Sequence, residues 1–245
     1  MRNLKLILTY DGTRYRGWQR LADSDNTIQG KLERTLSRLL EEPIELIGSG
    51  RTDAGTHALG QVANFHCNSP MSCQEILSKL RMYLPDDIGI RSCEEASPRF
   101  HARYNAKSKT YLYRVWNSDA PCVFQRGQVY RFEASLDLER MREAASLFLG
   151  THDFRAFCSN KNSKKSTLRT LYSLEITRQG NEIHFVLNGD GFLYNMVRIL
   201  VGTLLEVGMG KTEVGEIPAM LESRSRAAAG YTVPAHGLYL VEVAY

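Results

Sequence analysis

The chain carries the same order of strand and helix patterns twice, and this order constrains the fold more than any other feature. Each half reads strand, helix, strand, strand, helix, strand. In the first half the expected strands are 4–10, 44–47, 61–67 and 88–93, and the expected helices are 27–41 and 72–83. In the second half the strands are 109–116, 168–178, 182–188 and 237–243, and the helices are 138–149 and 193–207. This is the order of the split βαβ, or ferredoxin-like, unit. We therefore expect an α+β fold of two ferredoxin-like halves with antiparallel sheets, residues 1–104 and 105–245.

The composition excludes several classes of protein. With 43% hydrophobic and 24% charged residues, the 245-residue chain is neither disordered, collagen-like nor a coiled coil. Its most apolar stretch, 193–208, contains Asn195, Arg198 and Glu206 and is shorter than the ~20 apolar residues of a membrane span. The five cysteines are widely spaced and form no C-x-x-C pair. We expect a reduced, cytoplasmic protein that uses no metal.

A glycine-rich loop in the first half is the most unusual segment of the sequence. Residues 48–60 contain four glycines and place Arg51 two residues before Asp53. An arginine can hold a carboxylate by paired, charge-assisted hydrogen bonds, and so keep it ionised and oriented for nucleophilic chemistry. The alternative is an ordinary glycine turn that carries a surface ion pair.

Two stretches of the chain are basic and contain no acidic residue. Residues 97–118 interleave five cations with five aromatic residues, and 154–174 contain five further cations. Cations suit phosphates, and aromatic rings suit unstacked bases. A solvated surface on a mildly basic protein (net charge +4) is the alternative, but two such stretches favour RNA or DNA as a partner.

The apolar helix expected at 193–207 holds a third candidate group. Asn195 and Arg198 are three residues apart and share one face of this helix, and Asp190 lies just before it. A cation in so apolar a helix usually has a partner or a function. A snorkelling arginine at the helix edge is the alternative.

Taken together, these motifs resemble a known family. GSGRTDAGTHALGQVANF, FHARYNAKSKTYLYRVW, DFRAFC and GFLYNMVRILVGTLLEVG, in this order, are similar to the tRNA pseudouridine synthase A family, as are the opening YDGTRYRGWQ and the closing GLYLVEV. The resemblance spans nearly the whole chain. It implies conversion of uridine to pseudouridine at positions 38, 39 and 40 of the tRNA anticodon stem-loop. It also implies no cofactor or metal, a homodimer, and two ferredoxin-like halves joined around a central RNA-binding cleft.

The resemblance also assigns roles to individual residues. Asp53 corresponds to the catalytic aspartate, Tyr111 to the active-site tyrosine and Arg198 to the basic residue that pairs with the aspartate. Leu238 corresponds to an apolar residue of the uracil pocket, and Arg51 to an arginine that assists base flipping. Further substrate contacts are expected from Arg14, Arg16 and Gln19 of the opening motif and from Lys161, Lys164 and Lys165 of a basic segment.

Two other functions remain open from the sequence. The same chemistry could act on another RNA, such as a ribosomal RNA. A noncatalytic RNA-binding module would also explain the basic and aromatic stretches, although it would not need Asp53 beside Arg51 in a glycine loop.

Overall fold

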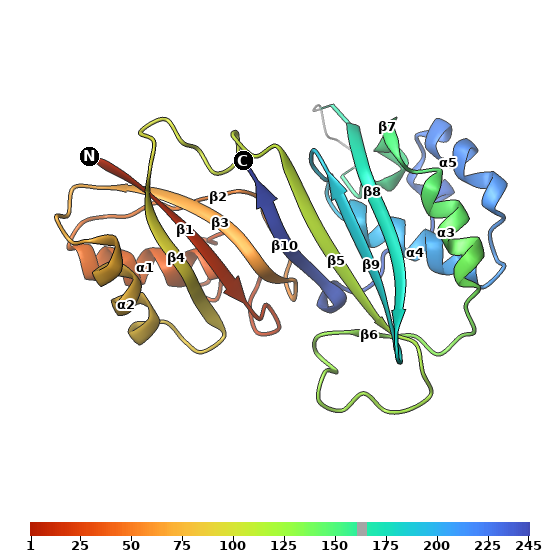
Figure 1. Ribbon diagram of the computed structural model, residues 1–245, viewed down its shortest axis with the longest axis horizontal. Helices are drawn as coiled ribbons and strands as arrows, with labels where there is room; N and C mark the ends of the chain where they lie inside the picture. Colours follow the sequence, from red (N-terminus) through yellow and green to blue (C-terminus); the bar gives the residue numbers. More distant parts are fainter. Residues whose placement is uncertain (161–165) are drawn as a thin grey trace. The chain divides into compact units, whose positions relative to one another are not determined.

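The computed structural model describes residues 1–160 and 166–245 (Figure 1). The chain divides into two compact units, one made of Met1–Lys107 with Tyr239–Tyr245 and the other of Ser108–Leu238. The sequence led us to expect all of 105–245 in the second half. Instead, the last residues group with the first unit, because β10 (Leu238–Ala244) pairs in parallel with β3 (His57–Cys67).

The first unit has the expected ferredoxin-like order of elements. Its bounds are β1 Arg2–Tyr10, α1 Ile28–Leu40, β2 Ile47–Gly48, β3 His57–Cys67, α2 Cys73–Tyr83 and β4 Ile88–Ala96. The strands lie in the order β4-β1-β3, and β2 pairs with β3. All of these pairings are antiparallel, as in the split βαβ unit.

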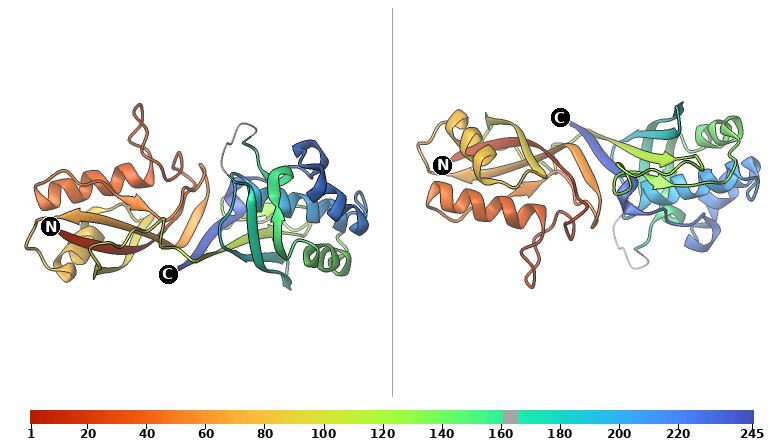
Figure 2. Two further views of the ribbon diagram at one scale, coloured as in Figure 1. Left: turned by 90° about the horizontal axis from the view of Figure 1, so that it is seen from above. Right: turned by 90° about the horizontal axis from the view of Figure 1, so that it is seen from below.

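One face of this sheet forms the core of the first unit. Leu4, Leu6 and Leu8 alternate along β1 and are fully buried. The apolar stripe of α1, which includes Ile28 and Leu32, is also fully buried. In the views of Figure 2, α1 lies alongside the strands of this unit. Each such buried side chain contributes about 1.5–3 kcal/mol.

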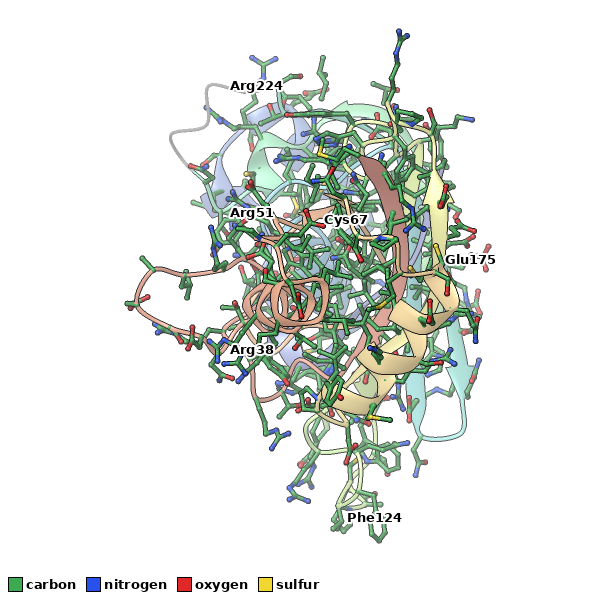
Figure 3. The ribbon with its side chains drawn as sticks, turned by 90° about the vertical axis from the view of Figure 1, so that its left-hand side faces the viewer. Arg38, Arg51, Cys67, Phe124, Glu175 and Arg224 are labelled. Carbon is green, nitrogen blue, oxygen red and sulfur yellow. The ribbon has the colours of Figure 1, made fainter. Side chains whose placement is uncertain are left out.

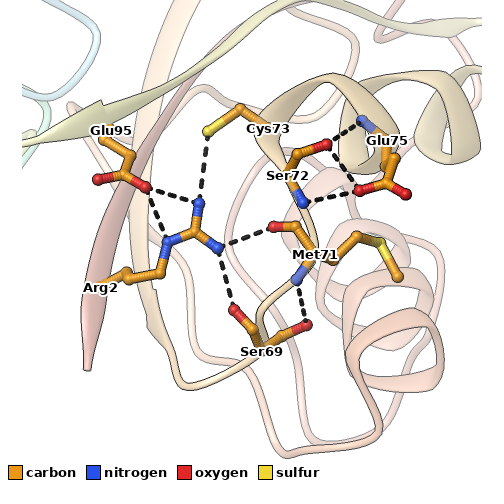
Figure 4. A network of polar contacts seen from close by, with 7 residues as sticks. All are labelled: Arg2, Ser69, Met71, Ser72, Cys73, Glu75 and Glu95. Atoms are coloured by element: carbon orange, nitrogen blue, oxygen red, sulfur yellow. Dashed lines mark hydrogen bonds and ion pairs between the residues drawn. The ribbon is translucent and has the colours of Figure 1, made fainter.

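Local sequence signals determine where the two helices of this unit begin. Thr27 caps α1 by accepting a hydrogen bond from the Gly30 amide (3.2 Å). Ser72 and Glu75 form a capping box at the start of α2 (Figure 4). Arg2 of β1 donates to the carbonyl oxygens of Ser69 and Met71 at 3.0 and 2.8 Å, so it ties the loop before α2 to the sheet.

The second unit also pairs antiparallel strands with helices. Its main elements are β5 Ser108–Trp116, β6 Tyr130–Arg131, α3 Leu138–Ser146, β7 Gly150–Asp153, β8 Leu168–Gln179, β9 Glu182–Gly189, α4 Met196–Gly208 and α5 Ile217–Ser223. Short 3-10 helices cover Phe154–Phe157, Val214–Glu216, Arg226–Ala228 and Ala235–Gly237. The strands lie in the order β5-β9-β8-β7, and β6 pairs with β5. The expected hairpin is confirmed, with Gln179 paired to Glu182.

Helix α4 is the central helix of the second unit. It begins at Met196, later than the expected start at 193, because Asn195 adopts a left-handed conformation with φ of 63°. Eleven of its thirteen residues are buried, and it packs on α3 and β5. Among the described residues, no helix is long and apolar enough to cross a membrane.

Candidate active site

The loop that carries Asp53 is fixed by hydrogen bonds from its backbone. It connects β2 to β3. The Thr52 carbonyl accepts from the Trp18 amide at 3.0 Å, and the Asp53 carbonyl accepts from the Thr56 amide at 3.1 Å. The Gly55 amide donates to the Tyr15 carbonyl at 3.4 Å. The opening motif of the sequence, residues 10–19, therefore holds the loop on both sides of Asp53.

Gly17 allows the opening motif to approach this loop closely. Its φ is +92°, and a Cβ atom there would lie 2.7 Å from the Thr52 carbonyl oxygen. A side chain at this position would meet backbone atoms in a conformation that L-residues rarely adopt. The close contact between the two segments therefore requires glycine.

A network of buried polar side chains holds the loop at Gly50 and Thr52. The Tyr10 hydroxyl and Thr52 Oγ1 are 2.8 Å apart, and Gln61 Nε2 donates to the Gly50 carbonyl at 3.0 Å. Ser49 Oγ donates to Gln61 Oε1 at 2.6 Å. Burial raises the pKa of Tyr10 to about 12, although its hydrogen bonds with Thr52 and Gln61 act in the opposite direction. Tyr10 therefore stays a neutral structural group.

The side chains of the GRTDAG motif differ in exposure because the loop turns over this network. Thr52 is buried, Asp53 is half-buried, and Arg51 is exposed (Figure 3). The buried Thr52 side chain holds the middle of the motif in place. Arg51 and Asp53 flank it in the sequence and are more exposed. Neither Tyr10 nor Gln61 was expected as part of this arrangement, because nothing local in the sequence indicates that they share a network.

Arg198, in the first turn of α4, donates hydrogen bonds to two neutral groups. Its Nε donates to the Val233 carbonyl at 2.7 Å and its Nη1 to Asn195 Oδ1 at 2.9 Å. Asn195 Nδ2 in turn donates to Ser159 Oγ at 3.0 Å. Asn195 was expected on the same helix face as Arg198, but it is the N-cap residue just before α4, and its side chain meets Arg198 from there. These two partners orient the guanidinium.

The segment that leads into Leu238 packs directly on α4 and β5. A Cβ atom on Gly202 would lie only 1.9 Å from the Tyr231 carbonyl oxygen, so the helix and this segment meet backbone to backbone. The Tyr113 hydroxyl donates to the Pro234 carbonyl at 2.7 Å. Burial raises the pKa of Tyr113, against the opposing effect of the Arg198 charge. Leu238 itself is buried.

Tyr111 lies on β5, opposite Leu187 of β9. Its ring meets that of Phe192 edge to face, with centroids 5.0 Å apart and planes at 78°. Such a contact fixes the orientation of the tyrosine ring. Phe192 was not expected to contribute, and its place in the GFLYN motif was the only available signal.

The structure divides the expected site residues between its units. Asp53 and Arg51 share one loop of the first unit, while Tyr111, Arg198 and Leu238 belong to the second.

Two of the expected substrate cations have acidic partners. Arg14 Nε donates to Asp87 Oδ2 at 3.0 Å, and Arg16 Nη1 lies 3.7 Å from Asp23 Oδ2. Gln19 is exposed. Lys161, Lys164 and Lys165 lie outside the described residues.

Several side chains of the basic stretch 97–118 pack or form ion pairs within the protein, although its composition indicated a nucleic-acid-binding surface. Tyr113 is fully buried, and Arg114 forms an ion pair with Glu182 at 2.8 Å. Phe100 packs on Tyr245, with ring centroids 4.9 Å apart. These side chains are therefore occupied within the fold, and only part of the stretch is available to a nucleic acid.

The described residues contain no group of three or more histidines, cysteines or acids arranged to hold a metal ion. All five cysteines are free thiols.

Comparisons with known proteins define the class of this chain. The family described as tRNA pseudouridine synthase matches residues 6–105 and 144–245. The chain is 51% identical to tRNA pseudouridine synthase A of Acetivibrio thermocellus over 245 residues, which cover all of both chains. With the same coverage, it is 48% identical to tRNA pseudouridine synthase A of Bacillus sp. (strain KSM-64) and 46% identical to tRNA pseudouridine synthase A 1 of Clostridium tetani. The chain therefore belongs to the tRNA pseudouridine synthase family, a family of isomerases.

Proposed function

We propose that this chain isomerises uridine to pseudouridine at positions 38, 39 and 40 in the anticodon stem-loop of tRNA, with Asp53 as the catalytic carboxylate. Full-length relatives named tRNA pseudouridine synthase A support the reaction and the class of substrate. The observation that carries the assignment of Asp53 is the GRTDAG loop, whose backbone is fixed on both sides of the acid. Preorganisation of this kind is what a group that must meet a ribose needs.

The reaction breaks the N1–C1′ bond of the uridine, turns the ring, and joins C1′ to C5. A uridine in a stem must first be extruded from the helix, and we assign Arg51 to holding it out. Asp53 either attacks C1′ or removes the 2′ proton, and its carboxylate lies beside the sugar on both routes. We assign Arg198 to pairing with that carboxylate.

Tyr111 is assigned to the uracil ring. Aromatic stacking is tolerant of base identity, and the edge contact with Phe192 fixes the tyrosine ring. Its phenol could also remove the C5 proton when the pseudouridine forms. Leu238 supplies apolar surface to the same base.

Substitution of the acid tests this proposal. Asp53→Asn is expected to lower the release of tritium from tRNA labelled at C5 of uridine by about a thousandfold or more, since the amide can neither attack nor accept the proton. Binding of the tRNA, followed by filter retention, should stay within about threefold of the wild type. The matched control is Asp86→Asn, at an exposed acid of the same unit. Turnover that survives in Asp53→Asn would contradict the assignment.

The target positions need a separate experiment. Mapping of pseudouridines in RNA from a strain that lacks the gene should show their loss at tRNA positions 38, 39 and 40, and their return on complementation. Loss at a ribosomal site instead would support the same chemistry on another RNA.

We further propose that the protein acts as a homodimer in the cytoplasm. The free state of all five thiols is typical of a reducing compartment. Light scattering coupled to gel filtration measures the oligomeric state directly, and a monomer mass would refute the dimer.

A further inference from the structure

A tight turn between β4 and β5, His101–Asn105, is anchored firmly to the first unit (Figure 1). The Asn105 amide donates to the His101 carbonyl at 3.0 Å, and the His101 amide donates back to Asn105 Oδ1 at 2.7 Å. His101 Nδ1 accepts from the amides of Arg103 and Tyr104 at 3.2 and 3.3 Å. The turn therefore satisfies four of its five backbone amides from within.

Two further hydrogen bonds connect the turn to the sheet. The Ala102 amide donates to Oδ1 of the buried Asn64 at 2.8 Å. The Ala102 carbonyl accepts from the Tyr245 hydroxyl at 2.7 Å. Ala102 is fully buried, so the turn is fixed to the first unit near its middle.

The same turn leaves an aromatic ring and a cation in solvent. Tyr104 is 77% exposed although its backbone is held, and Arg103 beside it is also exposed. The Tyr104 ring lies on the imidazole of His101, with centroids 4.1 Å apart and planes at 30°. The histidine supports one side of the ring, so the ring is preorganised as a stacking surface.

The cations of this turn and its neighbours differ from several basic residues of the first unit that are paired with acids. Arg2, Lys5 and Arg14 form ion pairs with Glu95, Glu94 and Asp87 respectively. Within residues 1–160 and 166–245, Arg103 and its neighbours Arg99 and Lys107 have no such pair, and residues 97–118 contain no acid. A positive charge that the protein does not neutralise is available to a phosphate.

We propose that His101–Asn105 is an RNA-binding platform, on which an unpaired base stacks against Tyr104 while Arg103 contacts a flanking phosphate. The proposal rests on the function proposed above and adds two substrate-positioning residues to it. RNA suits this surface because ring and guanidinium are adjacent on a rigid turn, so little ordering entropy is lost on binding.

The test compares three variants in binding and turnover. Tyr104→Ala should weaken the binding of an unmodified tRNA transcript by roughly five- to a hundredfold, as expected for one lost base stack. Tyr104→Phe should restore most of the affinity. Arg103→Gln should weaken binding and reduce the slope of log K against log salt by about one. In both weakened variants KM should rise with kcat unchanged, because neither side chain takes part in bond making.

The controls are Tyr83→Ala, at a tyrosine that is 63% exposed on α2, and Arg38→Gln, at an exposed arginine of α1 (Figure 3). Both should bind tRNA as the wild type does, and melting temperatures should match throughout. Wild-type affinity and KM in Tyr104→Ala and Arg103→Gln, measured with an active wild-type enzyme, would overturn the platform alone. An inactive wild-type enzyme would instead refute the proposed function.

Discussion

In the first unit, the backbone around Asp53 is fixed by residues 15–18, whereas in the second unit the side chain of Arg198 is fixed by its own hydrogen bonds. The acid is placed by a loop whose supports include Tyr10 and Thr52 beneath it. The cation is placed by the Val233 carbonyl, which comes from a distant segment. A candidate carboxylate can thus be oriented through its backbone, while a guanidinium needs partners for its own nitrogen atoms.

We expect the largest effect, a loss of free energy of unfolding, from substitution of the glycines that allow close backbone contacts in each unit. Gly202→Ala places a methyl group 1.9 Å from the Tyr231 carbonyl oxygen, and should lower the free energy of unfolding by about 3 kcal/mol. Gly17→Ala, with its positive φ and a 2.7 Å approach to Thr52, should cost about 2 kcal/mol. Urea titration measures both.

Gly215→Ala is the control for these two variants, since nothing lies within 4 Å of its Cβ position. It should change stability by less than about 0.5 kcal/mol. If Gly202→Ala were equally silent, the close packing of α4 on residue 231 would be refuted.

A charge-conserving substitution tests whether Arg198 needs its hydrogen bonds to Val233 and Asn195. Arg198→Lys keeps the positive charge but cannot donate to both Val233 and Asn195 in the same geometry, so kcat/KM should fall by about a hundredfold. Arg226→Lys is the matched control, because Arg226 also donates to a carbonyl, that of Ala229, at 3.0 Å. It should lose stability without a comparable loss of activity. Equal activity in the two variants would show that charge alone suffices at Arg198.

The smallest effect concerns the buried network under the Asp53 loop. Burial raises the pKa of Tyr10 to about 12. Above about pH 10 the unfolded tyrosine ionises while the folded one stays neutral, so stability falls between about pH 10 and 12. Tyr10→Phe removes that contribution to the slope, and at neutral pH it costs about 1 kcal/mol for the lost hydrogen bond with Thr52.

Denaturant titrations from pH 7 to 11 measure this slope, and Tyr83→Phe on exposed α2 is the control. An unchanged alkaline slope in Tyr10→Phe would show that Tyr10 is not the group responsible.

Local signals predicted most of the fold. The apolar stripe of α1 is a short-range feature, and the helix expected at 27–41 matches the observed Ile28–Leu40 to within one residue at each end. The start of β3 at His57 was missed because His57 and Ala58 pair with Tyr239 and Leu240, which are remote in the sequence. Short elements such as β2, with two residues, carry too little pattern to be bounded.

The candidate site likewise contains residues that the sequence predicted and supporting groups that it did not. Glycine content and spacing singled out Arg51 and Asp53, and an apolar helix made Arg198 conspicuous. The supports of these groups, such as the Val233 carbonyl, depend on tertiary contacts that no local pattern contains. Composition alone also treated Tyr113 and Tyr104 alike, as aromatic residues of a possible nucleic-acid surface. In the structure Tyr113 is buried and Tyr104 is exposed.

The pairing of β10 with β3 has a consequence for synthesis on the ribosome. Strand β3 is translated early, but its partners Tyr239 and Leu240 follow the whole of Ser108–Leu238. Residues His57 and Ala58 of β3 therefore lack these two partners while the intervening chain emerges, and the pairing with β10 is a late step of high contact order. Folding of the first unit is completed only after the second has been made.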